Sequence, residues 1–423
     1  MDLKQVQEIK QHLLDNKLTQ TEIGKLYGLS RGPISEIATN KKYREVEPVL
    51  QVLKIPGGQP KHLNLETQNI ALFGQLENVR QERNLLKRQL KAASKRIAVV
   101  DGIVEQLSPI IKPLKPAPAV KVKAAKGKVI DETLVLMFSD NHADQVVTPE
   151  EVDGLEDYNF RVSARRHEVL VEELLEWTQN SLGNFRFKKL VIMGLGDYTS
   201  GEIHGHVNRS YFGDQFTNDL AIAQLFAQVF RELSAHFEEV EIVSITGNHG
   251  RLTDRIEFTK EAVAANHDTL IMKIAEIHLQ NCENIKFEFP SGLSTVKEIE
   301  GWNFFLHHGH GKKGSGETWA RAKRKAGTIV PLHRGDINYF CSGHFHTPGD
   351  VAVSGGATML GNGAFLHCDQ YSYQNIDEAG DACQLIFGVH AHNGVTWRLP
   401  IKLATEGEKA GPQRYEIMER TDD

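Results

Sequence analysis

Five short apolar segments of the chain each end in side chains that bind metal ions or transfer protons. The segments and their polar ends are 133–142 with Asp140 and His142, 189–197 with Asp197, 240–250 with Asn248 and His249, 302–310 with His307, His308 and His310, and 337–346 with His344 and His346. One histidine or aspartate after a strand is usually a cap or a solvated loop residue, but five such loops in one chain are harder to dismiss. Carboxylates mixed with imidazoles and one amide suit Mn²⁺, Fe or Zn²⁺ better than they suit a cysteine-rich structural zinc site.

At least six candidate ligand side chains are too many for one tetrahedral ion, so the sequence predicts a pair of divalent ions. Two ions about 3.5–4 Å apart need a bridging carboxylate, and Asp197 is suited to that role because its two oxygens can each face one ion. Such a pair neutralises charge that develops on a phosphate and makes bound water more acidic. The expected chemistry is phosphoester hydrolysis with Mn²⁺ as the first candidate and Fe, Zn²⁺ or Mg²⁺ as alternatives.

The motifs follow one another in the order DxH, GD, GNH, HGH and GHxH. They stand here as Asp140-Asn141-His142, Gly196-Asp197, Gly247-Asn248-His249, His308-Gly309-His310 and Gly343-His344-Phe345-His346, over about half of the chain. This order resembles the calcineurin-like metallophosphoesterase superfamily. The resemblance implies a layered α/β domain with a pair of β-sheets flanked by helices. It also implies one metal on Asp140, His142, Asp197 and His346, a second on Asp197, Asn248, His308 and His344, and His249 as the acid that protonates the leaving oxygen.

One motif departs from the family pattern. In the family an acidic residue that holds the catalytic histidine usually follows GNH, whereas Gly250 and Arg251 follow here. The orientation of His249 must therefore come from elsewhere, and Asp254 is one candidate. Arg251 is expected either to bind a substrate phosphate through its planar guanidinium or to be a surface residue.

The HGH loop carries further candidates for substrate binding. His307 would point to the opposite face from His308 if the strand continues, so we expect His307 to pack and His308 to bind metal. His310 and Lys312 are candidates to contact substrate. Lys312 lies in a glycine-rich loop without the spacing of a P-loop, and the basic run after it is more typical of a solvated helix.

Four other polar residues have roles that the sequence leaves open. His204 and His206 either line the cleft or lie on the surface. Carboxylates usually orient metal-bound imidazoles through a second hydrogen bond. Asp336 and Asp350 are the candidates for that role, and the sequence does not choose between them.

The five apolar segments themselves have the composition of buried strands, because they are rich in Val, Ile, Leu and Phe and are bounded by Gly or Asp. Segments 161–180 and 215–237 between them show helical periodicity. This alternation predicts a layered α/β domain over 129–405, with the ligand loops at one edge of a sheet. Residues 406–423 are expected to be a polar tail.

The first 60 residues carry a pattern typical of a helix-turn-helix domain. In 20–37, QTEIGKLYGLSRGPISEI, a small Gly24 stands where two helices must cross closely, and Gly28 stands where a turn needs positive φ. Ser30 is placed to cap the next helix and Pro33 falls in its first turn. The expected core residues are Ile23, Leu26, Ile34 and Ile37.

The second helix of such a unit normally enters the DNA major groove. The predicted DNA contacts are Arg31 and Ser35 on that helix and Lys41 and Lys42 after it. Units of this kind also serve as protein-docking modules, which is the alternative interpretation. The charge distribution favours DNA, because residues 1–128 hold 23 basic and 12 acidic residues, a balance of +11, while the remainder carries −17.

A heptad repeat runs through 65–110. Its two seams are Leu72, Val79, Leu86, Ala93, Val100 and Leu107, and Leu76, Arg83, Leu90, Ile97 and Val104, with ten of the eleven positions apolar. A sustained period of 3.5 residues predicts a coiled coil and self-association through 72–107. The alternative is a long amphipathic helix packed on its own domain. Residues 111–128, rich in Pro, Ala and Lys, are expected to form a semi-rigid linker.

Length and composition exclude other classes of protein. A chain of 423 residues with 40% apolar and 25% charged residues is neither collagen-like nor disordered throughout. The N-terminus lacks the apolar segment of a secretory signal, and no stretch reaches the ~20 apolar residues that span a membrane. The four cysteines form no CxxC pair. We therefore expect a cytoplasmic protein without a membrane partner or a disulfide framework.

Two classes of function follow from these observations. The first is a binuclear metal-dependent phosphodiesterase, a DNA nuclease delivered by its helix-turn-helix arm. The second is a phosphatase of phosphoproteins or small phosphoesters, with the N-terminal region as an oligomerisation or regulatory module. A DNA-binding regulator with an inactive hydrolase body is the third, and the retention of every metal-ligand type argues against it.

Overall fold

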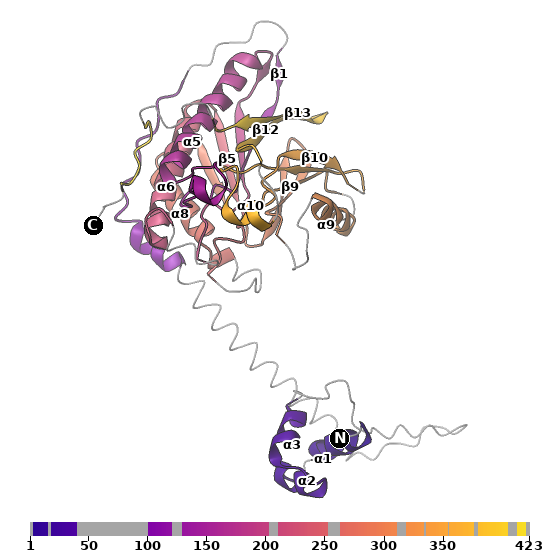
Figure 1. The fold of residues 1–423 in the computed structure, drawn as a ribbon. Coiled ribbons are helices and arrows are strands. Elements are labelled where there is room, and N and C mark those ends of the chain that lie inside the picture. Colours follow the sequence, from indigo (N-terminus) through magenta and orange to yellow (C-terminus); the bar gives the residue numbers. More distant parts are fainter. Residues whose placement is uncertain are drawn as a thin grey trace. The chain divides into compact units, whose positions relative to one another are not determined.

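The computed structural model describes residues 3–15, 18–39, 100–120, 129–202, 210–252, 263–310, 319–333, 336–353, 355–375, 380–404 and 413–419. The chain divides into two compact units, residues 1–91 and 92–423 (Figure 1). No helix in the described part of the chain is long and apolar enough to cross a membrane.

The described residues of the first unit form three helices, α1 (Leu3–Asp15), α2 (Gln20–Leu26) and α3 (Arg31–Ala38). Their apolar faces meet in a small core of Ile9, Ile23, Ile34 and Ile37. Thr19 begins α2 with a capping box, in which the Thr19 hydroxyl accepts from the Glu22 amide and the Glu22 carboxylate accepts from the Thr19 amide. This core orders the three short helices, which would be marginal in isolation.

The turn between α2 and α3 has the predicted glycine geometry. Gly28 has φ +67°, and a Cβ on Gly24 would lie 2.7 Å from the Leu29 carbonyl oxygen. Ser30 occupies the N-cap position of α3 as predicted, but its side chain makes no capping hydrogen bond. The expectation for Leu26 was wrong. Leu26 is 62% exposed instead of buried, because Ile23 and Tyr27 are the side chains that α2 and its C-cap pack against the core.

The second unit contains two large β-sheets. The six-stranded sheet has the order β13-β12-β2-β4-β5-β6, and the five-stranded sheet has the order β10-β11-β9-β8-β7. The strands of the first sheet are β2 (Thr133–Phe138), β4 (Lys189–Gly194), β5 (Glu239–Ser244), β6 (Ile285–Glu288), β12 (Cys383–His390) and β13 (Gly394–Lys402). The strands of the second sheet are β7 (Ser294–Ile299), β8 (Trp302–His307), β9 (Tyr339–Ser342), β10 (Gly349–Ala352) and β11 (Thr358–Gly361). Two short strands, β1 (Ile130–Asp131) and β3 (Phe185–Arg186), pair separately.

All five predicted strands are present, as β2, β4, β5, β8 and β9. Strands β2, β4, β5 and β6 run parallel, as do β8 and β9 in the second sheet. On β2, Leu134, Leu136 and Phe138 face one hydrophobic cluster, and Val135 and Met137 face another. A parallel strand that is buried on both faces has a continuous apolar sequence, which is why these segments do not alternate.

Helices cover the outer faces of the two sheets (Figure 1). The described helices of this unit include α5 (Phe160–Glu176), α6 (Gln215–Ser234), α8 (His267–Leu279), α9 (Trp319–Leu332) and α10 (Gln370–Asn375). A π-helical turn, Trp177–Ser181, follows α5, and a 3₁₀ turn, Pro149–Glu151, precedes it. Helices α5, α6 and α8 share a core with the six-stranded sheet, whereas Ala326 of α9 packs against the second sheet. The mixed α/β architecture with two sheets agrees with the prediction.

The end of the predicted coiled coil packs on this unit. Residues 65–99 lie outside the described part of the chain, but residues 100–107 are helical. Val100 is 2% exposed within the main core, and Val104 and Leu107 pack against that core. Asp101 also forms a 2.7 Å ion pair with Lys273 of α8. Over these residues the seam contacts the chain's own domain, which was the alternative interpretation of the heptad.

The first part of the predicted linker is bound to α8 and to the C-terminal end of α6. The Leu114 amide donates to the His278 carbonyl at 2.8 Å, and the Val120 amide donates to the Ala235 carbonyl at 2.8 Å. Residues 111–120 therefore adhere to the domain instead of spacing it from the arm, while 121–128 lie outside the described residues. The composition of the linker does not predict this packing, because two backbone amides make the contacts and backbone amides carry no sequence signature.

The expected polar tail also contributes to the core. Tyr415 is 5% exposed, and its hydroxyl donates to Glu232 of α6 at 2.7 Å. The backbone amides of Arg414 and Tyr415 donate to Glu168 of α5. Residues 413–419 thus join α5 and α6, although their composition is polar.

Candidate metal centre

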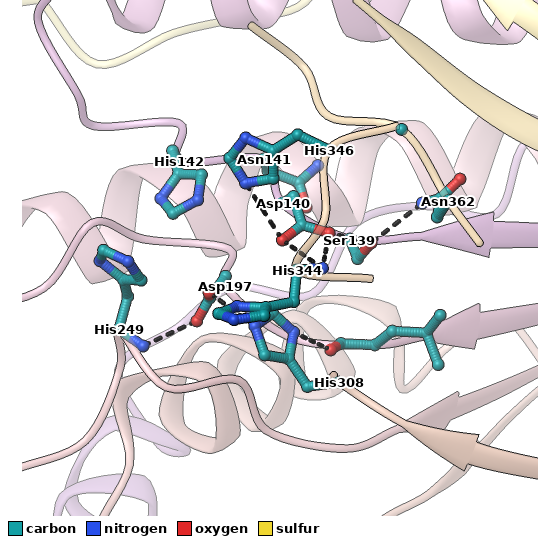
Figure 2. A network of polar contacts seen from close by, with 12 residues as sticks. Ser139, Asp140, Asn141, His142, Asp197, His249, His308, His344, His346 and Asn362 are labelled. Atoms are coloured by element: carbon teal, nitrogen blue, oxygen red, sulfur yellow. Dashed lines mark hydrogen bonds and ion pairs between the residues drawn. The ribbon is translucent and has the colours of Figure 1, made fainter. Parts of the chain in front are cut away.

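The predicted ligands meet where strands of both sheets end (Figure 2). Asp140 and His142 follow β2, Asp197 follows β4, and Asn248 and His249 follow β5. His308 follows β8, and His344 and His346 follow β9. The loops therefore come from two sheets, and the expectation of a single sheet edge was wrong.

Their side chains form three groups with metal-binding geometry. In each group the candidate ligand atoms lie within 4.8 Å of one another. The groups are Asp140, His142 and His346; His142, Asp197 and His249; and Asp197, His308 and His344. Asp197 belongs to two of them, as a carboxylate between two ions would. The first and third groups match the division that the family resemblance implies.

The backbone is strained at five of these residues. Asp140, His142, Asp197, His344 and His346 all have positive φ, between 40° and 71°, among seven such non-glycine residues in the described chain. This conformation costs of order 1–3 kcal/mol for each residue and persists only where the surroundings enforce it. The strain is concentrated where the loops turn carboxylates and imidazoles toward one point.

The glycines of the motifs allow the loops to approach closely. A Cβ on Gly196, whose φ is +89°, would lie 2.0 Å from the Gly247 nitrogen, and one on Gly247 would lie 2.1 Å from Asp197 Oδ1. A Cβ on Gly343 would lie 2.4 Å from Asp140 Oδ2. Each glycine in GD, GNH and GHxH thus makes room for a carboxylate or for the neighbouring loop.

Asp268, at the start of α8, joins two of these loops. Its carboxylate accepts from the amides of Asp197 at 3.0 Å, Tyr198 at 3.0 Å and Gly247 at 2.8 Å. Burial and the charge of Asp197 raise the pKa of Asp268 to about 6, against the lowering effect of those amides. Sequence reasoning missed Asp268 because α8 was not predicted and no motif surrounds it.

Three further residues support Asp140. The Ser139 hydroxyl donates to Asp140 Oδ2, and the Asn362 amide donates to Ser139 Oγ at 2.9 Å (Figure 2). Gln384 holds the same loop, because its side-chain oxygen accepts from the Ser139 amide at 3.1 Å. The His344 amide donates to both oxygens of Asp140 at 3.0 Å. Except for the contact between Ser139 and Asp140, these contacts join residues far apart in sequence, so no local pattern predicts them.

His308 is oriented by a backbone carbonyl. Its Nδ1 lies 2.8 Å from the Leu195 carbonyl oxygen, so Nδ1 donates and Nε2 faces the cluster. Nε2 lies 2.8 Å from Asp197 Oδ2 and 3.0 Å from Asn248 Oδ1. The predicted carboxylate partners lie elsewhere, since Asp350 pairs with Arg398 and Asp336 is exposed.

Charges within the cluster shift its pKa values strongly. Burial and the charge of His249 lower the pKa of His142 to about 3, so His142 is neutral and offers a lone pair. Burial would raise the pKa of Asp140, but the hydrogen bond and charge of His346 and the charge of His308 hold it below its usual value. Burial opposes ionisation of Asp197 as well, but the charges of His308 and His249 hold its pKa well below the usual range.

This donor set fits divalent cations. Asp140 and Asp197 are 0% and 1% exposed. Among the described residues, backbone amides and imidazoles contact their carboxylates, and no lysine or arginine forms an ion pair with either. Two buried carboxylates surrounded by imidazoles and one amide provide hard oxygen and borderline nitrogen ligands, the set that Mn²⁺, Fe and Zn²⁺ accept.

Among the described residues, a backbone carbonyl holds the His249 ring. Its Nδ1 lies 3.0 Å from the Ser200 carbonyl oxygen, and its amide donates to Asp197 Oδ1 at 2.7 Å. The His249 and His142 rings meet edge to face, 4.8 Å apart between centroids (Figure 2). Because a carbonyl only accepts, Nδ1 carries the proton of this hydrogen bond. Asp254, the predicted partner, lies outside the described residues.

The residues considered for substrate binding differ from one another in their surroundings. Arg251 donates from Nη1 to the Asn248 carbonyl at 2.6 Å, so its guanidinium turns back toward the GNH loop. His310 is 7% exposed and its ring lies 5.5 Å from that of His308. His307 is buried, and its Nδ1 accepts from the Gly309 amide at 2.8 Å. Lys312, His204 and His206 lie outside the described residues.

A cavity of about 270 Å³ is lined by Ser200, Gln145 and Asp369 among others. Ser200 lines this cavity and connects it to the cluster, because the Ser200 carbonyl holds His249 and the Ser200 hydroxyl lies 3.4 Å from His142 Nδ1. Of the described residues that line it, Glu151 and Asp369 are acidic and none is lysine or arginine.

Comparisons with known proteins find similar solved structures but no match among family models or curated sequences. No protein-family model matches this chain, and no curated protein matches its sequence. Among solved structures, it is similar to a conserved uncharacterised protein, described as a predicted phosphoesterase, from Streptococcus pneumoniae TIGR4. That similarity has 8% identity and a TM-score of 0.26 over 64% of this chain and 98% of that one.

Two further structures are similar at the same level. One is a hypothetical protein from Pyrococcus horikoshii OT3, with 9% identity and a TM-score of 0.33 over 66% of this chain and 91% of that one. The other is wild-type Vps29 complexed with Zn²⁺ from Entamoeba histolytica, with 12% identity and a TM-score of 0.25 over 64% of this chain and 100% of that one.

Proposed function

We propose that this protein is a binuclear metal-dependent phosphodiesterase. The observation that carries the proposal is the position of Asp197, which belongs to two groups of candidate ligands at once. The metal ligands of the proposal are Asp140, His142, Asp197, Asn248, His308, His344 and His346. Mn²⁺ is the first candidate for both sites, because the set mixes carboxylates and imidazoles.

His249 is the proposed acid in this reaction. A bound pair of divalent cations supplies charge neutralisation for a phosphate and an activated water. The chain's own contribution is to hold a proton on His249 for the departing oxygen. Its Nδ1 donates to the Ser200 carbonyl, so Nε2 is the ring nitrogen that can hold the proton that the leaving oxygen needs.

The proposed substrate is DNA, delivered by the N-terminal unit. Arg31 is exposed on α3 and Ser35 is half-buried there, and the basic residues Lys41 and Lys42 follow α3 in the sequence. The balance of +11 over residues 1–128 favours attraction to a polyanion. The proposal includes self-association only through the heptad positions that precede Val100, because Val100 itself is buried in the chain's own core.

A substrate and metal screen tests the hydrolase proposal. The metal-stripped full chain is given Mn²⁺, Mg²⁺, Fe²⁺ or Zn²⁺ with single-stranded DNA, double-stranded DNA and small chromogenic phosphoesters. We expect Mn²⁺-dependent hydrolysis that Asp197→Asn reduces by more than about 100-fold, since even outer-shell changes at metal sites cost about 10–100-fold. Asp350→Asn is the matched control and keeps activity, because Asp350 is half exposed and pairs with Arg398. Two ions that fail to bind, or equal activity in the two variants, would refute the proposal.

Arg31→Ala in the full chain tests delivery by the N-terminal unit. We expect weaker DNA binding with a reduced salt dependence and unchanged hydrolysis of a small phosphodiester. A truncation should remove residues 1–91 and keep 100–120, because Val100 is part of the core of the second unit. DNA binding that survives both changes would leave the N-terminal unit without a role in delivery.

The second candidate function is hydrolysis of small phosphoesters or phosphoproteins. The cavity next to Ser200 favours it, because Glu151 and Asp369 would repel the further phosphates of a polynucleotide on that side. In this case the N-terminal unit is an oligomerisation or regulatory module. The screen decides between the two: this function predicts that small phosphoesters are hydrolysed and that neither form of DNA is.

A further inference from the structure

The support of His249 depends on how well Ser200 is fixed. The Ser200 amide donates to Asp144 Oδ1 at 2.7 Å, and Asp144 is 1% exposed. The next residue, Gly201, touches the loop of His249, since a Cβ there would lie 2.1 Å from the His249 carbonyl oxygen. A neutral carbonyl orients His249 only if the loop that carries it cannot move.

A chain of buried hydrogen bonds runs from this loop to α6. The Thr199 hydroxyl donates to Asp144 Oδ2 at 2.9 Å. Gln215 Nε2 lies 2.8 Å from Thr199 Oγ1 and 2.8 Å from Asp219 Oδ1. Gln215 and Asp219 are one turn apart on α6, so both present their side chains to the same loop.

The chain then returns to His249 from the other side. Asp219 Oδ2 lies 2.6 Å from His267 Nδ1, at the start of α8. The His267 amide donates to the Gly250 carbonyl at 2.6 Å, and Gly250 directly follows His249 in the sequence. The hydrogen bonds and the peptide bond between His249 and Gly250 therefore close a ring. Apart from His249 itself, the side chains that form it are 9% exposed or less.

We infer that Asp219 and His267 are positioning residues for His249, and that the buried ring they complete takes the place of the missing acidic residue after GNH. The ring fixes both the carbonyl that holds the imidazole and the backbone that follows it. Satisfied buried networks of this kind define one conformation because every broken link leaves an unpaired polar group. The inference rests on the proposed hydrolysis, in which a small displacement of an acid lowers the rate strongly.

Leaving-group dependence tests this inference in the full chain loaded with metal. Phenyl and p-nitrophenyl phosphoesters of the class that the wild type hydrolyses are compared. Phenolate is the poorer leaving group and needs more help from an acid. Asp219→Ala should lower turnover on the phenyl ester about tenfold or more, below the full 10²–10⁴-fold of general acid catalysis. Turnover on the p-nitrophenyl ester and bound metal should stay close to wild type.

Two other variants break or keep the ring in different ways. Asp219→Asn retains a side chain that can bond both Gln215 and His267, so it should restore most of the phenyl-ester turnover. Gln215→Met opens the ring at a second point with little change in volume and should reproduce the loss. Gln215→Met also tests the inference if Asp219→Ala does not fold.

Glu132→Ala is the matched control. Glu132 is 6% exposed and accepts hydrogen bonds from Thr396 at 2.7 Å and Trp397 at 2.9 Å. It directly precedes β2, whose other end leads into the site. It should leave the ratio of the two turnover rates unchanged. Equal losses on both esters in Asp219→Ala and Gln215→Met would overturn the positioning role. Absence of metal-dependent turnover in the wild type would instead overturn the proposed hydrolysis.

Discussion

Nε2 of His308 lies 2.8 Å from Oδ2 of Asp197, at the centre of the candidate metal site. Burial alone would lower the pKa of His308, but the charge of Asp197 and this hydrogen bond raise it to about 9. Below that pH the metal-free protein keeps a proton between the two side chains. A cation that binds both groups must displace that proton.

Metal binding is therefore expected to release at least one proton at pH 7. Because the pKa of His308 is raised, the proton is bound below about 9, and apparent metal affinity should rise up to about tenfold per pH unit toward that value. Calorimetry in two buffers with different ionisation enthalpies measures the proton count. His308→Gln should release one proton fewer, and an identical count in both proteins would contradict this assignment.

Gly196→Ala should disrupt the site. The new Cβ would lie 2.0 Å from the Gly247 nitrogen in a residue with φ +89°, so the GD and GNH loops must separate. We expect a loss of unfolding free energy beyond the roughly 1–2 kcal/mol of left-handed strain, together with lost metal. Gly154→Ala is the control, because Gly154 has φ +83° and no atom within 4 Å of the new Cβ. Urea unfolding and the amount of bound metal per chain should distinguish Gly196→Ala from Gly154→Ala. Equal stability and metal content in the two variants would show that the contact between the GD and GNH loops is unimportant.

His249→Ala should retain both metals and lose turnover on poor leaving groups. The expected loss is about 10²–10⁴-fold, the usual contribution of a general acid. The same variant tests the other role that the geometry permits, because His249 also forms a ligand group with His142 and Asp197. Elemental analysis that finds less metal in His249→Ala than in the wild type would make His249 a ligand.

His167 should make the fold sensitive to acid. Burial lowers its pKa from 6.5 to about 3, although the Ser163 carbonyl opposes this. The neutral ring therefore contributes stability that is complete above about 6.5 and is lost as the pH falls toward 3. Between pH 6 and 4 the unfolding free energy of His167→Gln should depend less on pH than that of the wild type. The difference is up to about 1.4 kcal/mol per pH unit, which corresponds to one proton. Equal slopes in chemical denaturation would contradict the assignment.

Tyr415 should contribute to stability although it lies in a polar terminal segment. Tyr415→Ala removes a ring from the main core and should cost about 3–5 kcal/mol of unfolding free energy, as other buried aromatic truncations do. Tyr415→Phe loses only the hydrogen bond to Glu232 and should cost about 1 kcal/mol. Tyr371→Ala, at a residue 63% exposed, should change stability by less than about 0.5 kcal/mol. A terminus that contributed nothing would leave all three equal.

The sequence alone determined the elements and side chains that follow from local patterns. Apolar runs that end in Asp140, Asp197 or His308 predicted β2, β4 and β8, because a buried strand and the turn after it are encoded within a few residues. Gly28 was predicted to have positive φ for the same reason. The division of ligands into two groups came from a family resemblance and stays a prediction, since the described residues form three candidate groups.

Only the tertiary structure decided how these side chains are held. Asp268 joins the GD and GNH loops although it lies 71 residues from Asp197, and the Ser200 carbonyl contacts the His249 ring from 49 residues away. The packing of Val100 against its own domain was equally hidden, because a heptad seam has the same sequence whichever surface covers it. A backbone carbonyl carries no residue type, and a contact across long sequence separation has no period. The pattern therefore reveals which groups do the chemistry, and the folded chain determines what orients them.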